Sequence, residues 1–208
     1  MMSSNIQEVA FRRLVGEKNF SELEKWRKHS LATGAVAKII SEALAKKSLS
    51  FSPALCISGA LLHDIGREVS VGTLHGWYGY LLLSKDKNLI SCARYCITHW
   101  LKGRTEKEIL EQSSLPENLV KKILRKGNFV NLSYEDIVVC VADAMAQDDV
   151  LVDIENRYED ARRRYGDTVW VDENYRKTLE FKSRLESILG CSLYSLFSKF
   201  GESLTFAL

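Results

Sequence analysis

The 208-residue sequence predicts an all-α fold in a single domain, and three observations support this. Apolar residues recur at helical spacing along almost the whole chain, and no stretch alternates for long enough to predict a strand. Hydrophobic residues make up 46% of the sequence, which is enough to bury a sizeable core in one domain. No internal repeat, low-complexity stretch or linker divides the chain.

Three helices are predicted in the first third of the chain. They run over 6–15, from Ser21 toward Lys47, and from Ser52 to Gly66. His29 leads the apolar stripe of the second helix. The third has a favourable start, because the Ser52 hydroxyl can cap it and Pro53 then occupies the first helical position.

Four shorter helices are predicted next. They begin at His75, near Leu89, at Thr105 and at Ser114. His75 follows a loop that contains Gly72, and His99 lies near the end of its helix before Gly103. Thr105 and Ser114 each precede a glutamate by three residues, which is the spacing of a capping box.

Two long helices are predicted in the last third. One begins at Ser133 and meets no proline or glycine until Gly166, and the other runs from a cap at Asp172 to Leu189. Asp143 lies on the apolar side of the first, and a carboxylate that faces a core needs a charge partner. Asp148 and Asp149 follow on the same predicted helix and are expected to face solvent or form a helix pair, and the tail 191–208 is apolar enough to pack.

The overall charge and the first residues give no sign of a nucleic-acid or membrane partner. The net charge is +2, close to neutral. Glu8, Arg12 and Arg13 interrupt the first apolar stretch, unlike the core of a signal peptide. No stretch approaches the roughly 18 apolar residues that a membrane span needs. We therefore expect a cytoplasmic protein.

The five cysteines have no regular spacing and are interpreted as reduced core thiols. Cys92, Cys96 and His99 have the spacing of one helix face, so a separate soft-metal site there is an alternative. A basic run of Lys121, Lys122, Arg125 and Lys126 is interpreted as a solvated helix face.

The four histidines and two of the aspartates form a pattern typical of a divalent-metal site. These residues are His29, His63, Asp64, His75, His99 and Asp143. Imidazole nitrogens and carboxylate oxygens in buried positions can neutralise one another through a shared cation. A lone histidine such as His29 is more often a hydrogen-bonded core residue, but here every histidine falls into the ordered pattern. The adjacent His63 and Asp64 can converge only where a helix ends.

The same residues resemble the HD superfamily of metal-dependent phosphohydrolases, in its HDIG subgroup, over about Ser21 to Asp143. The similar motifs are Leu61–Arg67 (LLHDIGR), His75–Tyr80 (HGWYGY) and Ile97–Trp100 (ITHW). The resemblance implies a compact HD-domain helical bundle of about six to nine helices with the metal site in its centre. It implies one domain over 1–208, with a core over 21–166, a helix over 4–15 and an extension over 167–208 packed on it.

In that family the first histidine, the His-Asp pair and the distal aspartate bind one metal, which implies His29, His63, Asp64 and Asp143 here. Members with two further histidines hold a second metal, which implies His75 and His99 with Asp64 as the bridge. Trp100 departs from binuclear relatives that have paired histidines. A mononuclear site, in which His75 and His99 contact substrate phosphate, therefore stays an alternative.

The resemblance implies one or two divalent ions, from Mn, Fe, Co, Ni or Zn, that activate water for attack on a phosphoester. Asp64 and Arg67 are the candidate catalytic residues: Asp64 would orient the water, and Arg67 would bind a phosphate oxygen or, alternatively, only cap the helix end. The expected partner is a nucleotide or another small phosphorylated metabolite, cleaved as a phosphomonoester or phosphodiester. Trp77, Tyr78 and Trp100 are core residues or, less often, stack on a nucleobase.

Two other functions are compatible with this sequence. A few relatives use a di-iron centre for oxygenase chemistry. Alternatively, the protein is a nucleotide-binding or signalling module that keeps the metal but has no turnover. The sequence does not predict the oligomeric state.

Overall fold

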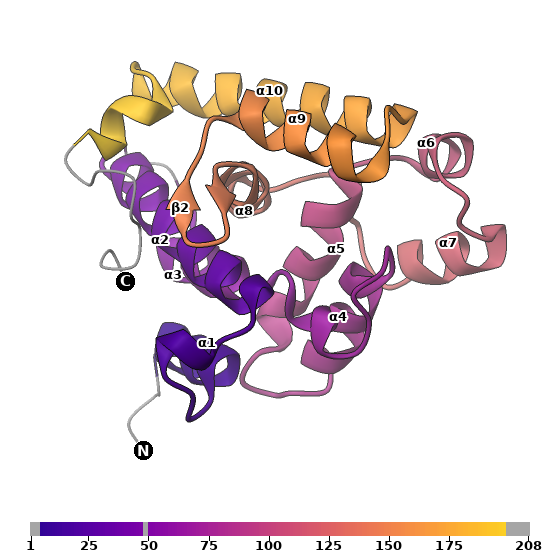
Figure 1. Ribbon diagram of the computed structural model, residues 1–208, viewed down its shortest axis with the longest axis horizontal. Helices are drawn as coiled ribbons and strands as arrows, with labels where there is room; N and C mark the ends of the chain where they lie inside the picture. The colour runs from indigo at the N-terminus through magenta and orange to yellow at the C-terminus, as the bar shows by residue number, and fades with distance from the viewer. Residues whose placement is uncertain (1–4, 48–49, 199–208) are drawn as a thin grey trace.

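The computed structural model describes residues 5–47 and 50–198 and confirms the all-α fold (Figure 1). Within these residues there are ten α-helices, four short 3-10 helices (η) and two two-residue strands. The α-helices thus number one more than the six to nine expected. The elements are α1 (Ile6–Val15), η1 (Phe20–Glu22), α2 (Lys25–Ala45), α3 (Pro53–Leu62), η2 (Ile65–Glu68), α4 (His75–Leu83), η3 (Ile90–Cys92), α5 (Ala93–Leu101), α6 (Glu106–Gln112), α7 (Glu117–Leu124), α8 (Tyr134–Ala144), β1 (Ala146–Gln147), β2 (Val150–Leu151), α9 (Ile154–Tyr165), α10 (Val169–Leu189) and η4 (Leu193–Phe197).

The main core lies where α2, α3 and α8 pack against one another. α2 is buried over most of its middle, including Ala35, Val36 and Ile40, because other helices surround it. α1 covers α3, and α5 packs against α8 and α3. These contacts bring helices from the first, middle and last thirds of the sequence around one centre.

Several predicted helix starts are confirmed. The Ser52 hydroxyl accepts a hydrogen bond from the backbone N–H of Leu55, as a cap before Pro53 should. Thr105 forms a capping box with Glu108, and Ser133 forms one with Asp136. Local sequence determines these starts because the cap and its partner are only three residues apart.

Two other predicted caps are wrong. Pro116, rather than Ser114, is the residue before α7, and the Ser114 side chain caps nothing there. Thr168, rather than Asp172, caps α10, and its hydroxyl accepts from the backbone N–H of Val171. Asp172 lies in the first turn of α10, where its negative charge interacts favourably with the helix dipole.

The prediction of one long helix from Ser133 to Gly166 is also wrong, because this segment forms α8, a hairpin and α9. β1 and β2 pair antiparallel, with Ala146 opposite Leu151. Asp148 turns the chain with a φ of 50°, a left-handed conformation that aspartate tolerates better than most residues. Asp148 and Asp149 therefore lie in a turn and not on a helix. No glycine or proline marks this break, so periodicity alone could not show it.

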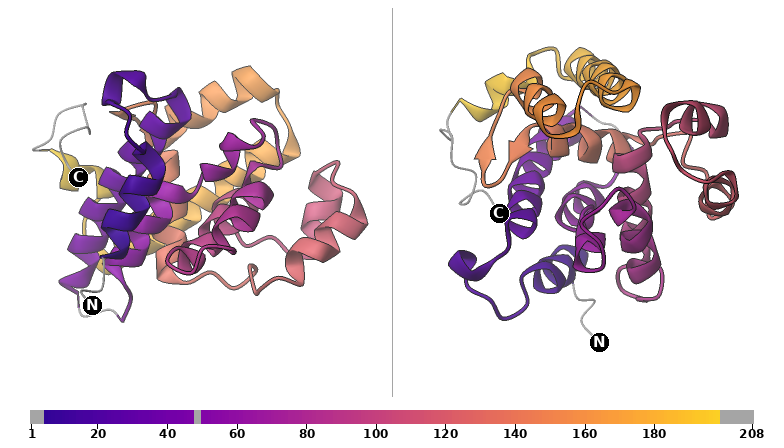
Figure 2. Two further views of the ribbon diagram at one scale, coloured as in Figure 1. Left: turned by 90° about the horizontal axis from the view of Figure 1, so that it is seen from below. Right: turned by 45° about the vertical axis from the view of Figure 1, so that its right-hand side comes forward.

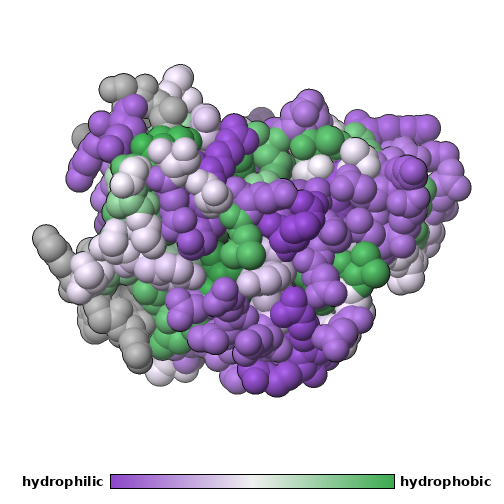
Figure 3. Space-filling view, turned by 90° about the horizontal axis from the view of Figure 1, so that it is seen from above, coloured by the Kyte–Doolittle hydropathy of each residue, from purple (hydrophilic) through white to green (hydrophobic). Residues whose placement is uncertain are grey.

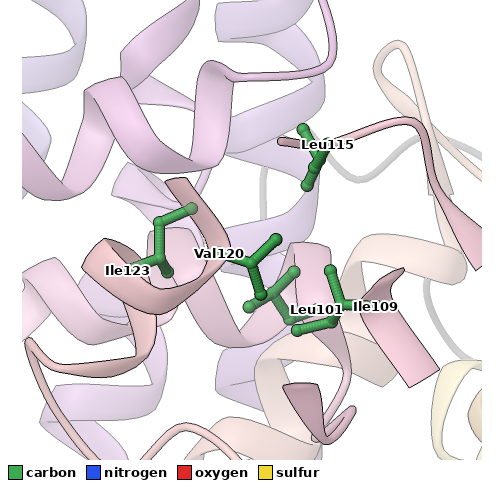
Figure 4. A pocket seen from close by; sticks show the side chains of 5 residues that line it. All are labelled: Leu101, Ile109, Leu115, Val120 and Ile123. Atoms are coloured by element: carbon green, nitrogen blue, oxygen red, sulfur yellow. The ribbon is translucent and has the colours of Figure 1, made fainter. Parts of the chain in front are cut away.

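A second, smaller core joins α4 and α5 to α6 and α7, and the last two helices stand out to one side of the bundle (Figure 2). Trp77 and Trp100 are buried in it, whereas Tyr78 is half-buried. The side chains of Leu101, Ile109, Leu115, Val120 and Ile123 converge on an apolar gap that leaves no room for a water molecule (Figure 4). This region is filled by packing and offers no polar group to a ligand.

The C-terminal helices α9 and α10 lie side by side across one face of the bundle (Figure 1). α10 also packs on α8 and α2, and η4 buries Leu193 and Phe197. η4 packs against α2 and α10, while 199–208 lie outside the described residues. The face that carries α9 and α10 is mostly hydrophilic with separate apolar patches (Figure 3). In the part of the chain that the structure describes, every helix is too short or too polar to cross a membrane.

Candidate metal centre

Six predicted ligand residues come from five separate parts of the fold and meet at the centre of the bundle. His29 comes from α2, His63 and Asp64 follow the last turn of α3, His75 begins α4, His99 lies on α5, and Asp143 lies near the end of α8. Five of these six residues are buried or nearly so, and the Asp143 side chain is 19% exposed.

The end of α3 allows His63 and Asp64 to face the same centre. α3 ends at Leu62, four residues before the predicted end at Gly66. His63 still has helical dihedral angles, but Asp64 has φ −100° and ψ 7° and opens the 3-10 helix η2. The change of direction between the two residues places His63 Nε2 only 3.9 Å from Asp64 Oδ2.

A first group of possible ligands consists of His29, His63 and Asp64, whose ligand atoms all lie within 4.8 Å of one another. Asp143 stands outside this triad, but its Oδ1 lies 3.0 Å from His29 Nε2 and 3.7 Å from His63 Nε2. A cation among the triad would therefore have the Asp143 carboxylate at its side.

A second group consists of Asp64, His75 and His99, again with ligand atoms within 4.8 Å of one another. Asp64 Oδ1 lies 3.2 Å from His75 Nε2 and 3.6 Å from His99 Nε2. The two imidazole Nε2 atoms are 3.2 Å apart. Asp64 belongs to both groups, which is the geometry that a bridging carboxylate requires.

Backbone carbonyl groups set the tautomers of three of these histidines. The Nδ1 atoms of His63, His75 and His99 face the carbonyl oxygens of Ala60, Gly72 and Tyr95 at 2.6, 2.9 and 2.9 Å. Because a carbonyl can only accept, each Nδ1 carries the hydrogen and each neutral ring offers a lone pair at Nε2. All three lone pairs point into the centre.

These lone pairs test whether the centre fits a cation. His63 Nε2 is buried and has no hydrogen-bond partner among the described residues. The lone pairs of His75 and His99 would repel each other at 3.2 Å unless a proton or a cation lies between them. Burial lowers the pKa of His63 to about 3 and also lowers the pKa of His75, so a proton is disfavoured there. The donor set therefore fits a divalent cation.

The two carboxylates supply negative charge to the same centre. Burial alone would raise the pKa of Asp64, but the surrounding imidazole groups and Arg67 hold it well below the usual range. Burial would likewise raise the pKa of Asp143, which the imidazole groups of His29 and His63 and the Lys102 ammonium lower. Both groups are therefore ionised at neutral pH. A pair of buried carboxylates among neutral imidazoles is the charge pattern that a metal ion balances.

Arg67 contacts Asp64 directly. Its Nε donates a hydrogen bond to Asp64 Oδ2 at 2.5 Å, and its side chain is 27% exposed. Arg67 is thus neither a free surface residue nor a simple helix cap. It holds the carboxylate that the two groups share.

Gly66 explains how the segment after Asp64 can approach α4. A Cβ atom at this position would overlap the carbonyl oxygen of His75 and the backbone nitrogen of Gly79. Only glycine therefore allows η2 to lie against the first turn of α4. This close approach brings His75 to Asp64.

Two ion-pair clusters that the sequence did not reveal hold the elements around the centre. Glu68 accepts hydrogen bonds from Arg13 at 2.8 and 2.6 Å and from Arg27 at 2.7 Å, which ties η2 to α1 and α2. Asp136, fully buried, accepts from Arg94 at 3.0 and 2.7 Å and from Thr98 at 2.9 Å. The capping position of Asp136 can be predicted from the sequence, but its hydrogen bonds with Arg94 and Thr98 on α5 depend on the fold.

The cysteines take no part in either group. In the residues that the structure describes, the possible metal groups contain only histidine and aspartate. Cys96 Sγ donates instead to the carbonyl oxygen of Leu62 at 3.4 Å. Burial raises the pKa of Cys92 to about 12, which keeps it a thiol. The alternative soft-metal site on α5 is therefore not supported.

The family model described as HD domain matches residues 26–148, which is more than half of the chain and includes all six residues of the centre. Neither the curated proteins nor the solved structures include a match to this sequence.

Proposed function

Because this chain belongs to the HD domain family, whose members are generally metal-dependent hydrolases, we propose that it hydrolyses a phosphoester with water activated at two divalent ions. The observation that carries the proposal is the position of Asp64 in both ligand groups. We assign His29, His63, Asp64 and Asp143 to one ion, and His75 and His99 with the shared Asp64 to the other. Such ions lower the pKa of water and withdraw charge from a phosphoryl group.

The residues of the chain then have distinct tasks. Asp64 holds both halves of the centre together, and Arg67 fixes the orientation of Asp64 through its Nε. The Arg67 side chain is 27% exposed, and besides the Nη1 bond to the carbonyl oxygen of Val71 at 3.5 Å its guanidinium has further N–H groups that can donate to a phosphoryl oxygen. Arg67 is therefore a candidate for both orientation and charge stabilisation.

The proposed substrate is a nucleotide or another small phosphorylated metabolite. The support is the limited access to the site: its ligands lie at the centre of one helical bundle, and the most exposed side chains around it, those of Arg67, Asp143 and His75, are 27, 19 and 14% exposed. The buried positions of Trp77 and Trp100 make them unsuitable for stacking on a base. We propose one domain over 1–208, with 21–166 as its catalytic core and Mn, Fe, Co, Ni or Zn as the metal.

The test is a hydrolysis assay on protein with a measured metal content. The full-length protein is loaded separately with Mn(II), Fe(II), Co(II) and Ni(II) and offered phosphomonoesters, phosphodiesters and nucleotides. Release of phosphate or a nucleoside product, lost after chelation and restored by metal, is the expected result. Inactivity of fully loaded protein on every substrate would contradict the proposal, and oxygen consumption by a di-iron form would instead favour an oxygenase.

A further inference from the structure

Glu68 is the last residue of η2, the short element that begins directly after Asp64. The backbone N–H of Arg67 donates to the carbonyl oxygen of Asp64 at 2.9 Å, which keeps η2 tightly wound. The Arg67 side chain also donates to the Asp64 carboxylate. A displacement of the end of η2 would therefore move the carboxylate that both ligand groups share.

The Glu68 carboxylate joins η2 to two helices. It accepts two hydrogen bonds from Arg13 on α1, at 2.8 and 2.6 Å, and one from Arg27 on α2, at 2.7 Å. The Glu68 and Arg27 side chains are only 23 and 13% exposed, so solvent screens their bond less than it screens an exposed ion pair. Charge-assisted hydrogen bonds are also directional. They therefore fix the end of η2 against both helices.

Arg27 is itself held from several sides, which makes it a firm anchor for Glu68. Its Nη1 donates to the carbonyl oxygen of Leu14 in α1, and its Nε lies 2.8 Å from a carboxylate oxygen of Glu24. Arg27 precedes the ligand residue His29 by two positions on α2. The bond between Arg27 and Glu68 therefore connects the helix that carries His29 to η2.

A second attachment holds η2 on the side of α4. Gly66 lies so close to the first turn of α4 that a Cβ atom would overlap the carbonyl oxygen of His75. Helix α4 carries His75, and α2 carries His29. The position of η2 between these helices, and with it that of Asp64 between its two groups, therefore depends on both Gly66 and Glu68.

We propose that Glu68 is a positioning residue of the metal centre, which holds the Asp64 carboxylate in place through η2 without contacting a metal ion or the substrate. Arg27 provides the more important attachment, because α2 carries a ligand residue and α1 carries none. This inference rests on the ligand assignment made in the proposed function.

The experiment measures the Co(II) affinity of the full-length protein by competition with a chelator. Glu68→Ala removes all three hydrogen bonds. Glu186→Ala is the matched control, because the Glu186 side chain is 22% exposed and joins α10 to η4 by accepting from the backbone N–H of Leu193 at 2.8 Å. Neither α10 nor η4 carries a ligand residue. Both variants should unfold at lower urea concentration when metal-free, but only Glu68→Ala should bind cobalt more weakly, by about tenfold.

The visible spectrum of bound cobalt separates a positioning role from a purely structural one. The absorption of Co(II) depends on the arrangement of its ligands, so cobalt-saturated Glu68→Ala should differ from the wild type, whereas Glu186→Ala should not. An unchanged spectrum or an unchanged cobalt affinity in Glu68→Ala would overturn the inference. An equal loss of affinity in Glu186→Ala would do the same, because it would show a general effect of stability.

Two arginine variants test the same claim if Glu68→Ala does not fold. Arg27→Gln breaks the link between α2 and η2, whereas Arg13→Gln leaves this link intact and replaces a side chain that is 36% exposed. Arg27→Gln should weaken cobalt binding about tenfold, and Arg13→Gln should weaken it less. A loss in Arg13→Gln as large as that in Arg27→Gln would contradict the proposal.

The outcome is separable from that of the proposed function. Hydrolysis of phosphoesters by a protein whose cobalt affinity does not depend on Glu68 would overturn this inference alone. Cobalt binding that depends on Glu68, in a protein that hydrolyses no phosphoester with any metal, would overturn only the proposed function. Failure of the wild type to bind cobalt would overturn both.

Discussion

The two ligand groups that share Asp64 differ in how the fold supports them. His29 and Asp143 lie on α2 and α8, and His63 directly follows α3; these helices form the main core, and the His63 side chain is 1% exposed. His75 begins α4 directly after a loop in which Val71 is 79% exposed, and its own side chain is 14% exposed. The first group therefore lies on the helices of the main core, with the Asp143 side chain 19% exposed, whereas the second depends on a helix that begins directly after an exposed loop.

Because of this difference, we expect the two halves of the centre to have separate tasks. A ligand set fixed by a close-packed core needs little reorganisation when it binds a metal. A set that depends on an exposed loop can exchange its ion and admit a substrate more easily. We therefore expect the first ion to bind more tightly and the second to face the substrate.

The largest expected effect comes from Asp64→Asn, which changes the one residue that both groups share. An amide in place of the carboxylate removes a negative charge and a bridging oxygen. Changes to residues that only support a metal ligand commonly cost tenfold to a hundredfold in metal affinity or activity, so this change should cost at least about a hundredfold in activity. Metal content by mass spectrometry and hydrolysis of the best substrate are the two measurements.

Asp148→Asn is the matched control for this substitution. Asp148 is an exposed turn residue with a left-handed backbone that asparagine also tolerates. Full metal content and activity are expected in the control. If Asp64→Asn also retained full metal content and activity, Asp64 would not be a metal ligand.

The next largest effect is a difference in metal content between His63→Ala and His75→Ala. His63→Ala should reduce the affinity of the tighter ion and leave the protein with little metal after dialysis. His75→Ala should retain about one ion per chain, because His29, His63, Asp64 and Asp143 are intact, while its activity falls about tenfold or more. Equal metal content in the two variants would show that the groups do not differ in strength.

A smaller effect is expected in the stability of the metal-free protein as the pH falls. Burial lowers the pKa of His63 in the folded state to about 3, whereas an unfolded histidine titrates near 6.5. Between these values the unfolded state binds more protons, so the free energy of unfolding should decrease as the pH falls from about 6.5 toward 3. One such group contributes about 1 kcal/mol per pH unit.

Urea unfolding at a series of pH values checks this expectation and also compares the two groups. His63→Gln should flatten the pH dependence in this window. His75→Gln should flatten it less, because His75 lies at the exposed side of the centre. A wild-type stability that is constant over this range would mean that His63 is not held in its neutral form.

The smallest effect is expected from Cys96→Ala, on the helix that carries His99. The thiol is buried and donates to the carbonyl oxygen of Leu62, so its removal should cost about 1 kcal/mol of stability through lost packing. Metal content and activity should not change. Loss of one metal equivalent would instead mean that the thiol belongs to the second group.

The sequence predicted those features that depend on short-range chemistry. The Ser52 cap, the Thr105 box and the positions of His75 and His99 on their helices follow from residues only a few positions apart. The histidines and aspartates could be selected because their residue types are rare in a core. Their ordered spacing, with the family resemblance, then suggested one centre.

Features that depend on long-range contacts could not be predicted in this way. The hairpin around Asp148 has no glycine or proline and is set by packing against α2. The pairing of Arg94 with Asp136 joins residues 42 positions apart, and that of Arg13 with Glu68 joins residues 55 apart. Lys102 looks like a surface lysine in the sequence, and only the fold reveals its burial.

Anomalous X-ray diffraction from crystals of Mn(II)-loaded protein tests the central claim most directly. We expect two manganese peaks about 3.5 to 4 Å apart, one on each side of the Asp64 carboxylate. The first should lie against His29, His63 and Asp143, and the second against His75 and His99. In crystals with two manganese ions per chain, peaks that lie away from Asp64 would contradict the claim that this carboxylate joins two metal sites.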